Sequence, residues 1–492
     1  AATRVDENGL VNYAEVVSTD NVILNPNMDN SIPLGTAGSG WEQSNGIVEF
    51  SNGGLKLTNI STSARARAKT SINNSLVLQP NTMYQFTYDV ISNNNVASSG
   101  TILFVSGAIT GLIPNTVGSH IFNFISGSST NGIFQIYNNT PNSDITFDNT
   151  FVKEIQRDNV PRIDYTGGGC PHILAEPQRT NLLPYSEDFS LWSKAGYTVQ
   201  SNVGISPSGN IDASSLTNPS GGGGYIKQNA TVTASTDYTF SFYAKIGTSS
   251  DAKYSVYDNT NGANIISSTS YFSQLNSDTF TRVTVSFTTP VGSTSIGVYA
   301  LRDNLSAGTV IVWGGQVEAG SYATSYIPTS GSTVTRNQDI FTRDGITSLI
   351  NSTEGTLVIE PRYFIDDGSG RKISISDGTG SNRIYITPYQ GLASRIRYIF
   401  TSGGSTQADL QVTGIDITVS RKLAFVWATN RFELWQNGVK ISEDTSGTTP
   451  SAGTFNQINF SSETGNGSDP FEGELKQLQV YKTALTDEQL LQ

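Results

Sequence analysis

The residue types that most often carry catalysis are scarce in this chain of 492 residues. It has two histidines, His120 and His172, and a single cysteine, Cys170. A Ser-His-Asp or Cys-His site needs a histidine beside its nucleophile, and a zinc site needs several nitrogen or sulfur ligands. His120 begins an apolar strand, and His172 lies in a connector rich in proline and glycine. The sequence therefore favours neither nucleophilic catalysis nor a zinc site.

Acidic residues are the remaining candidates for acid–base chemistry, since the chain has 41 Asp and Glu. Two carboxylates on either side of a glycosidic bond can hydrolyse it. Their separation cannot be read from a sequence, and no Glu-x-Asp-x-x-Glu-like run lies on a predicted strand. We therefore predict that the protein is not an enzyme, with a polysaccharide depolymerase as the lesser alternative.

Composition favours a chain of strands and tight turns. Only 14% of the residues are charged, and Gly, Ser, Thr and Asn are abundant. Glycine and asparagine supply the positive φ that turns need, and threonine suits strands, so the predicted fold class is all-β. The net charge of −12 excludes strong attraction to nucleic acid, and no apolar run is long enough for membrane insertion. One cysteine allows no internal disulfide, which fits assembly in a reducing cytoplasm.

One pattern occurs twice along the chain. Residues 21–29, followed by Trp41, resemble residues 180–189, followed by Trp192. An alternating strand follows each opening at nearly the same distance. Repetition at domain length indicates tandem modules rather than a solenoid.

We predict three tandem β-sandwich domains joined by irregular connectors. Three prolines and three consecutive glycines between the two jelly rolls, at residues 158–180, argue against a regular element of any length there. The segments are a strand-like lead (1–18), a jelly roll (19–157), a connector (158–180), a second jelly roll (181–330), a linker (331–344) and a third sandwich (345–492).

The third segment carries a recognisable pattern. Glu354–Leu357, the hairpin Phe432–Val439 with its Asn-Gly turn, and the ending 471–490 together resemble the concanavalin A-like (laminin G-like) lectin fold. The ending also includes a capping box that begins at Thr486. The two earlier modules resemble the galactose-binding-like jelly rolls of carbohydrate-binding modules. The resemblance implies lectin-like domains whose partners are surface glycans.

The pieces between the modules resemble a mosaic found in structural and fibre proteins of tailed bacteriophages. These pieces are residues 2–10, 160–165, 174–183 and 316–336. In the commoner form the first two lie close together, so the first jelly roll looks inserted between them. The resemblance implies a virion surface protein, a tail fibre or a head decoration protein, assembled in the host cytoplasm. It also implies other virion proteins as partners and a homo-oligomer, commonly a trimer; a purely structural spacer or cement protein is the alternative.

Sugar binding by folds of this kind uses an aromatic ring that stacks on a pyranose face, with amides or carboxylates beside it. The candidates for carbohydrate binding are Trp41, Trp192, Trp435 and Tyr257. Trp313 and Trp427 lie in apolar strands and are expected in cores. Tyr254 and Tyr257 fall on opposite faces of one strand, so at most one of them faces solvent.

Jelly rolls of the resembled kind often hold a structural Ca²⁺ between the opening loop and the last strand. The corresponding oxygen ligands in the first module are those of Asn25, Asp29 and Asp148. The resemblance thus implies Ca²⁺ as the cofactor. The alternative is that these residues form turns through their own side chains and bind no ion.

Overall fold

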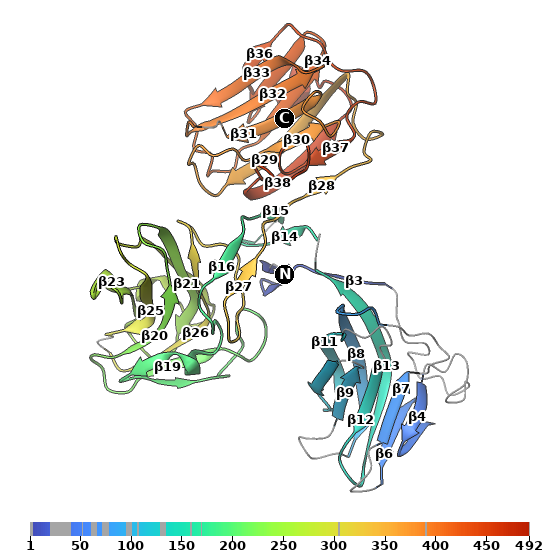
Figure 1. The fold of residues 1–492 in the computed structure, drawn as a ribbon, viewed down its shortest axis with the longest axis vertical. Helices are drawn as coiled ribbons and strands as arrows, with labels where there is room; N and C mark the ends of the chain where they lie inside the picture. The colour runs from blue at the N-terminus through green and yellow to red at the C-terminus, as the bar shows by residue number, and fades with distance from the viewer. Residues whose placement is uncertain are drawn as a thin grey trace. The chain divides into compact units, whose positions relative to one another are not determined.

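The chain folds into strands and turns, which confirms the all-β prediction (Figure 1). The computed structural model describes residues 3–19, 41–51, 53–60, 66–70, 78–94, 101–105, 108–127, 134–157, 160–168, 170–303, 306–388 and 391–491, with the backbone alone at 42–45, 69–70 and 101–112. The α-helix in this part of the chain is Asp487–Leu490 (α1), which begins with the predicted capping box at Thr486. No helix among the described residues is long and apolar enough to cross a lipid bilayer.

The chain divides into two compact units. The inserted unit is Glu15–Val160, and the main unit combines Ala1–Ala14 with Pro161–Gln492. The chain of the main unit is therefore interrupted by the inserted unit, as the spacing of the connector pieces indicates.

The inserted unit is a sandwich of two antiparallel sheets, with the strand orders β11-β8-β13-β6-β5 and β10-β9-β12-β7-β4. Alternate residues of β8 from Tyr84 to Val90 are buried in its core, as the sequence pattern predicts. A short strand, β3, pairs with the end of β13. The strands are β3 (Val16–Val17), β4 (Trp41–Asn45), β5 (Ile47–Ser51), β6 (Gly54–Asn59), β7 (Ala66–Thr70), β8 (Met83–Asn93), β9 (Thr101–Val105), β10 (Ala108–Leu112), β11 (Gly118–Ile125), β12 (Phe134–Asn138) and β13 (Ser143–Gln156).

The second sandwich, in the main unit, has sheets of the orders β17-β20-β25-β22-β23 and β18-β19-β26-β21-β24. Apolar side chains of both sheets, such as Phe242 and Val298, are fully buried between them. Two single-turn 3-10 helices, Phe189–Leu191 and Phe272–Gln274, lie in its loops. The strands, with the pair β16–β27 beside them, are β16 (Arg179–Asn181), β17 (Ser193–Ala195), β18 (Thr198–Gln200), β19 (Ser214–Asn218), β20 (Tyr225–Thr231), β21 (Asp237–Ile246), β22 (Lys253–Asp258), β23 (Ala263–Ser270), β24 (Thr281–Thr288), β25 (Ser295–Arg302), β26 (Gly308–Ala319) and β27 (Val334–Arg336).

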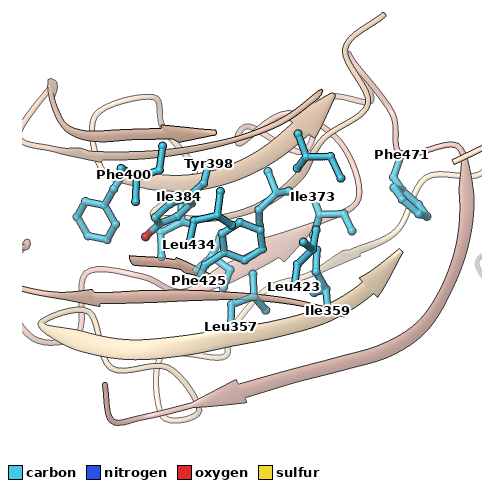
Figure 2. Packing of buried hydrophobic residues seen from close by; sticks show 14 of the residues in the cluster. Leu357, Ile359, Ile373, Ile384, Tyr398, Phe400, Leu423, Phe425, Leu434 and Phe471 are labelled. Carbon is cyan, nitrogen blue, oxygen red and sulfur yellow. The ribbon is translucent and has the colours of Figure 1, made fainter. Parts of the chain in front are cut away.

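The third sandwich has sheets of the orders β14-β15-β38-β29-β34-β35-β36 and β28-β37-β30-β31-β32-β33. Figure 2 shows side chains of the two sheets pointing toward one another, among them Tyr398 and Phe425, whose ring centroids lie 4.9 Å apart. Asn437 and Gly438 have φ of 48° and 76°, which confirms the predicted hairpin turn. The strands are β14 (Arg162–Asp164), β15 (His172–Ala175), β28 (Thr342–Arg343), β29 (Glu354–Tyr363), β30 (Ile373–Ser376), β31 (Arg383–Pro388), β32 (Arg395–Ser402), β33 (Ser405–Thr413), β34 (Leu423–Ala428), β35 (Arg431–Gln436), β36 (Val439–Asp444), β37 (Gln457–Asn459) and β38 (Gly473–Tyr481).

The connector before the second sandwich is more regular than its composition suggests. Its strands β14 and β15 pair with each other, and β15 pairs with β38, so the connector extends a sheet of the third sandwich. Pro161, Pro171 and Pro177 lie just outside these short strands, where no ladder hydrogen bond is required of them. The prediction of an irregular connector is therefore wrong for these two strands.

Four charged side chains are buried together in the main unit. Arg162 and Arg336 both donate hydrogen bonds to Glu176, and Arg162 also donates to Asp339. Burial opposes the charge on Glu176, but Arg336 and Arg162 outweigh it and lower the pKa of Glu176 to about 2. Burial raises the pKa of Asp339, because it outweighs the attraction of Arg162. We call these four residues the arginine cluster.

Glu176→Gln should destabilise the main unit, because it leaves Arg162 and Arg336 buried without the carboxylate that they share. Urea denaturation of the intact chain at pH 7 should show a loss of about 3–5 kcal/mol. The pKa of Glu176 lies below its ordinary value of 4.5, so its contribution is complete above that pH and is lost as the pH falls toward about 2. The difference between wild type and variant should shrink over that range.

Asp409→Asn is the control, since Asp409 pairs with Arg397 on the surface of the third sandwich. Loss of this exposed pair should cost about 1 kcal/mol or less. Equal losses in the two variants would contradict the role given to the arginine cluster.

Candidate functional site

One outer face of the second sandwich is covered by the start of the chain. Thr3–Val5 (β1) and Val11–Tyr13 (β2) form a hairpin within the predicted strand-like lead. Val11 packs against Trp313 and Tyr326 in a buried apolar cluster. Because Trp313 belongs to β26, the hairpin covers the outer side of the sheet that contains β26.

The outer face of the other sheet is partly accessible: Asn229 is exposed and Tyr225 and Tyr257 are half-buried, whereas Tyr299 and Ser255 are buried beneath their neighbours. Residues alternate along β20, so that Ile226 and Ala230 enter the core while Tyr225, Lys227 and Asn229 point outward. Outward residues of β25, β22 and β23 continue the same surface. We call this surface the tyrosine face, which comprises Tyr225, Lys227, Asn229, Ser255, Tyr257, Asn259, Asn264, Gly297, Tyr299 and Arg302.

A β-bulge in β25 brings Tyr299 and Arg302 to the same face. Residues three apart in a regular strand point to opposite sides. The pairing with β20 passes from Leu301 directly to Tyr299, so Ala300 is an extra residue that resets the alternation. Without the bulge, one of these two side chains would point into the core.

Two cations lie over the tyrosine rings. Lys227 Nζ is 5.5 Å from the ring centroid of Tyr299 and 5.7 Å from that of Tyr225. Arg302 Cζ is 4.6 Å from the centroid of Tyr299 and 5.7 Å from that of Tyr257. At these distances the ring quadrupole attracts a cation, so each charge is held against the aromatic surface.

Gly297 lies in the middle of the face, opposite Asn229 on β20 and Tyr257 on β22. A Cβ atom at this position would come 3.2 Å from Asn229 Oδ1, 3.3 Å from Tyr299 Cε2 and 3.4 Å from Asn259 Oδ1. These approaches are tighter than ordinary van der Waals contact, so glycine is needed here because a ring edge and two amides already crowd the position. Asn259 Nδ2 donates to Asn229 Oδ1 at 3.3 Å, which holds the two amides together.

Asp258 fixes the turn from which Asn259 projects. Its Oδ1 accepts hydrogen bonds from the backbone nitrogens of Thr260 and Asn261, at 2.9 and 3.0 Å. Burial opposes the charge on Asp258, but these bonds outweigh it and lower the pKa of the carboxyl. Asp258 is therefore ionised, and its carboxylate stabilises the turn below the tyrosine face.

Several polar atoms of the face are available to a ligand. Among the described residues, the hydroxyls of Tyr225, Tyr257 and Tyr299 and the Nδ2 atom of Asn229 have no hydrogen-bond partner. Aromatic rings beside amide groups can bind a sugar, since rings cover its C–H faces and amides bond its hydroxyls.

Three of the four side chains predicted to stack on a sugar are buried. Trp41, Trp192 and Trp435 are 0%, 2% and 4% exposed. Trp192 stacks on Phe189 with ring centroids 4.5 Å apart, and its Nε1 donates to Tyr185 O. The free energy gained by burying so large a ring favours this position. These three rings therefore have no exposed face on which a sugar could stack, and the prediction that they bind carbohydrate is wrong.

Tyr257 is the predicted residue that lies on an accessible face. Tyr254 stacks on Tyr271 on the core side of the same strand, which confirms that the two tyrosines face opposite ways. Lys227 and Arg302 were not among the residues predicted to bind a sugar. The alternation of β20 could have placed Lys227 on the face, but Arg302 reaches it only through the bulge.

Of the three predicted calcium ligands, Asp148 lies among the described residues. Asn25 and Asp29 lie outside the described residues. Asp148 lies opposite Asp89 in the β13–β8 ladder, and its buried Oδ1 atom has no hydrogen-bond partner. In the part of the chain that the structure describes, no group of three or more His, Cys, Asp or Glu side chains is placed to hold a metal ion. Asp148 could supply one ligand.

The two histidines lack the neighbours that nucleophilic catalysis needs. His120 Nε2 lies 2.6 Å from Thr116 O. His172 is buried, and its Nε2 lies 3.5 Å from Asp164 Oδ1 and 3.8 Å from Glu474 Oε1. Across the described ranges, neither ring is hydrogen-bonded to a serine, threonine or cysteine side chain.

Comparison with known proteins defines the class of the C-terminal domain. Residues 362–491 match the concanavalin A-like lectin/glucanases superfamily. Together with the two sheets of the third sandwich, this match identifies a concanavalin A-like, laminin G-like domain. No curated protein matches the chain.

Three solved structures are among those similar to this chain. A carbohydrate-binding module (CBM40) of a Ruminococcus gnavus sialidase, bound to α2,3-sialyllactose, is 18% identical over 29% of this chain and 84% of its own, with a TM-score of 0.26. The tandem CBM22 domains of Paenibacillus barcinonensis Xyn10C are 11% identical over 62% and 99%, with a TM-score of 0.24. Domains LG4-5 of the mouse laminin α1 chain are 11% identical over 65% and 92%, with a TM-score of 0.22. At these values none of the three bears on what this chain binds.

Trp192→Ala and Tyr257→Ala should differ sharply in their effect on stability. Trp192 fills the core of the second sandwich, so its truncation should lower the free energy of unfolding by about 3–5 kcal/mol. Tyr257 lies on the outer face, so its truncation should cost about 1 kcal/mol or less. Chemical denaturation of the intact chain measures both, and comparable losses would contradict the assignment of one side chain to the core and the other to the surface.

Proposed function

We propose that this protein binds glycans without modifying them, and that the tyrosine face is a binding site. The observation that carries the proposal is the grouping of three tyrosines and two asparagines on the outer face that the hairpin β1–β2 leaves accessible. The concanavalin A-like domain at residues 362–491 supports the same class of function.

The chemistry of the face suits a pyranose. A sugar that rests on the outer surface of this sheet would meet the phenol of Tyr257 and the amides of Asn229 and Asn259. The aromatic ring would cover C–H groups, and the amides and phenol hydroxyls would bond the sugar hydroxyls. A shallow face of this kind binds one sugar weakly, so useful adhesion would need several copies acting together.

The biological setting belongs to the same proposal. The phage-like connector pieces support a virion surface protein, either a tail fibre or a head decoration protein, that reaches host or environmental glycans. Assembly as a homo-oligomer, such as a trimer, would supply the multivalency that weak sites require. Light scattering of the intact chain in solution tests this part, and a monomeric mass would count against it.

Tyr257→Ala should abolish glycan binding by the second sandwich, because it removes a tyrosine ring of the face that is not buried. The measurement is retention of the intact chain on a glycan array and on host polysaccharides. Thr284→Ala, on an exposed position of β24 in the other sheet, is the matched control and should retain full binding. Equal retention of both variants would move the site elsewhere, and silence of the wild type would favour the spacer or cement role. Release of reducing ends would revive the depolymerase.

A structural Ca²⁺ in the inserted unit is a separate proposal. It is supported by the partnerless Oδ1 atom of Asp148 and by Asp89 directly opposite, because adjacent carboxylates repel each other unless a cation lies between them. Excess EDTA should lower the unfolding temperature of the inserted unit, and added Ca²⁺ should restore it. An unfolding curve that neither addition changes would eliminate the ion.

A further inference from the structure

The two cations of the tyrosine face differ in what holds them. Arg302 Nη1 donates to Ser255 Oγ and to Asn264 Oδ1, each at 3.0 Å, and Arg302 Nε lies 3.3 Å from Asp303 Oδ2. Its guanidinium is therefore fixed by neighbours on both sides. Lys227 Nζ lies over two rings but, among the described residues, has no carboxylate within 4.0 Å.

In this respect Lys227 differs from two other lysines of the main unit that lie over aromatic rings. Lys372 Nζ also lies over a tyrosine ring, that of Tyr385, but Asp469 is 2.8 Å away. Lys440 Nζ lies over the ring of Trp435 and donates a hydrogen bond to Glu433 Oε1. In a chain with a net charge of −12, an ammonium that is held on an accessible face without a carboxylate is available to an anionic ligand.

The register of the sheet places Lys227 on the same surface as Asn229 and Tyr257. Lys227 pairs with Tyr299, and two residues further along β20 Asn229 pairs with Gly297, which in turn pairs with Tyr257. Successive residues of a strand rise about 3.4 Å, so Lys227 and Asn229 leave the strand about 7 Å apart. A sugar that rests on the amide of Asn229 would therefore bring a charged substituent within reach of the ammonium of Lys227.

We infer that the tyrosine face prefers sugars with an anionic substituent, with Lys227 as the residue that determines this specificity. The inference rests on the proposed function. Tyr257 and the amides would bind the sugar ring itself, whereas Lys227 would bind the carboxylate or sulfate that the ring carries. A lysine ammonium is a point charge, so it favours an anion without selecting between these two groups.

The test uses the intact chain and matched pairs of polysaccharides in biolayer interferometry. One arm compares uronic acid polymers (polygalacturonate and alginate) with their carboxyl-reduced forms, and the other compares a sulfated galactan with its desulfated form. The wild type should bind the anionic member of at least one pair about tenfold more tightly. The preference should fall as NaCl rises from about 50 to about 500 mM, because salt screens the exposed charge.

Lys227→Met should reduce the preference to within about twofold by weakening the binding of the anionic member, and methionine keeps an unbranched apolar chain against the rings. Lys245→Met is the matched control. Lys245 Nζ lies 5.0 Å from the ring centroid of Phe280 but belongs to β21, in the other sheet, so this variant should keep the full preference.

The outcomes separate the inference from the proposed function. Equal binding of anionic and neutral members by the wild type, or an unchanged preference in Lys227→Met, would overturn the inference while glycan binding stood. Failure of the wild type to bind any polysaccharide of either kind would overturn the proposed function itself. A preference that both lysine variants lose equally would also overturn the role of Lys227, because it would reflect overall charge.

Discussion

The main unit depends on the arginine cluster. Arg162 reaches Asp339 across 177 residues of sequence, and Arg336 reaches Glu176 across 160. Removal of one partner from a buried ion pair costs several kcal/mol, because the remaining charge is then stranded away from water. Each of the segments that contribute a residue is therefore held in place by the others. Short strands such as β14 and β27, which would be unstable alone, gain fixed positions from this constraint.

The same cluster determines which surface of the second sandwich can bind a ligand. Arg162 Nη1 also donates to Thr3 O at 3.1 Å, which holds the hairpin β1–β2. The hairpin packs on Trp313, so the outer side of one sheet is committed to contacts within the protein. The tyrosine face on the opposite sheet remains, and its character follows from a single extra residue, Ala300. The arginine cluster holds the hairpin, the hairpin covers one sheet, and the bulge at Ala300 arranges the side chains on the sheet that remains.

Local patterns predicted those features that local physics decides. The alternation of β8, the opposite directions of Tyr254 and Tyr257, the turn at Asn437 and the capping box at Thr486 follow from periodicity and turn chemistry. Trp41, Trp192 and Trp435 were assigned to binding because their chemistry permits it, but whether a ring is buried depends on partners far away in sequence. For the same reason, no pattern could indicate that Arg162, Glu176, Arg336 and Asp339 meet. The bulge at Ala300 also has no sequence signal, since it shifts the alternation of an otherwise ordinary strand.

The interruption of the main unit has a consequence for the order of synthesis. Val5 N donates to Asp164 Oδ2 at 2.9 Å, and Tyr165 N donates to Val5 O at 3.0 Å, so the hairpin needs residues beyond 160 as partners. A ribosome must complete the inserted unit first, which takes on the order of ten seconds. An isolated hairpin is marginally stable in water. The hairpin β1–β2 therefore lacks its stabilising partners while the inserted unit folds. The hairpin is therefore synthesised before the inserted unit but reaches its final position only after it.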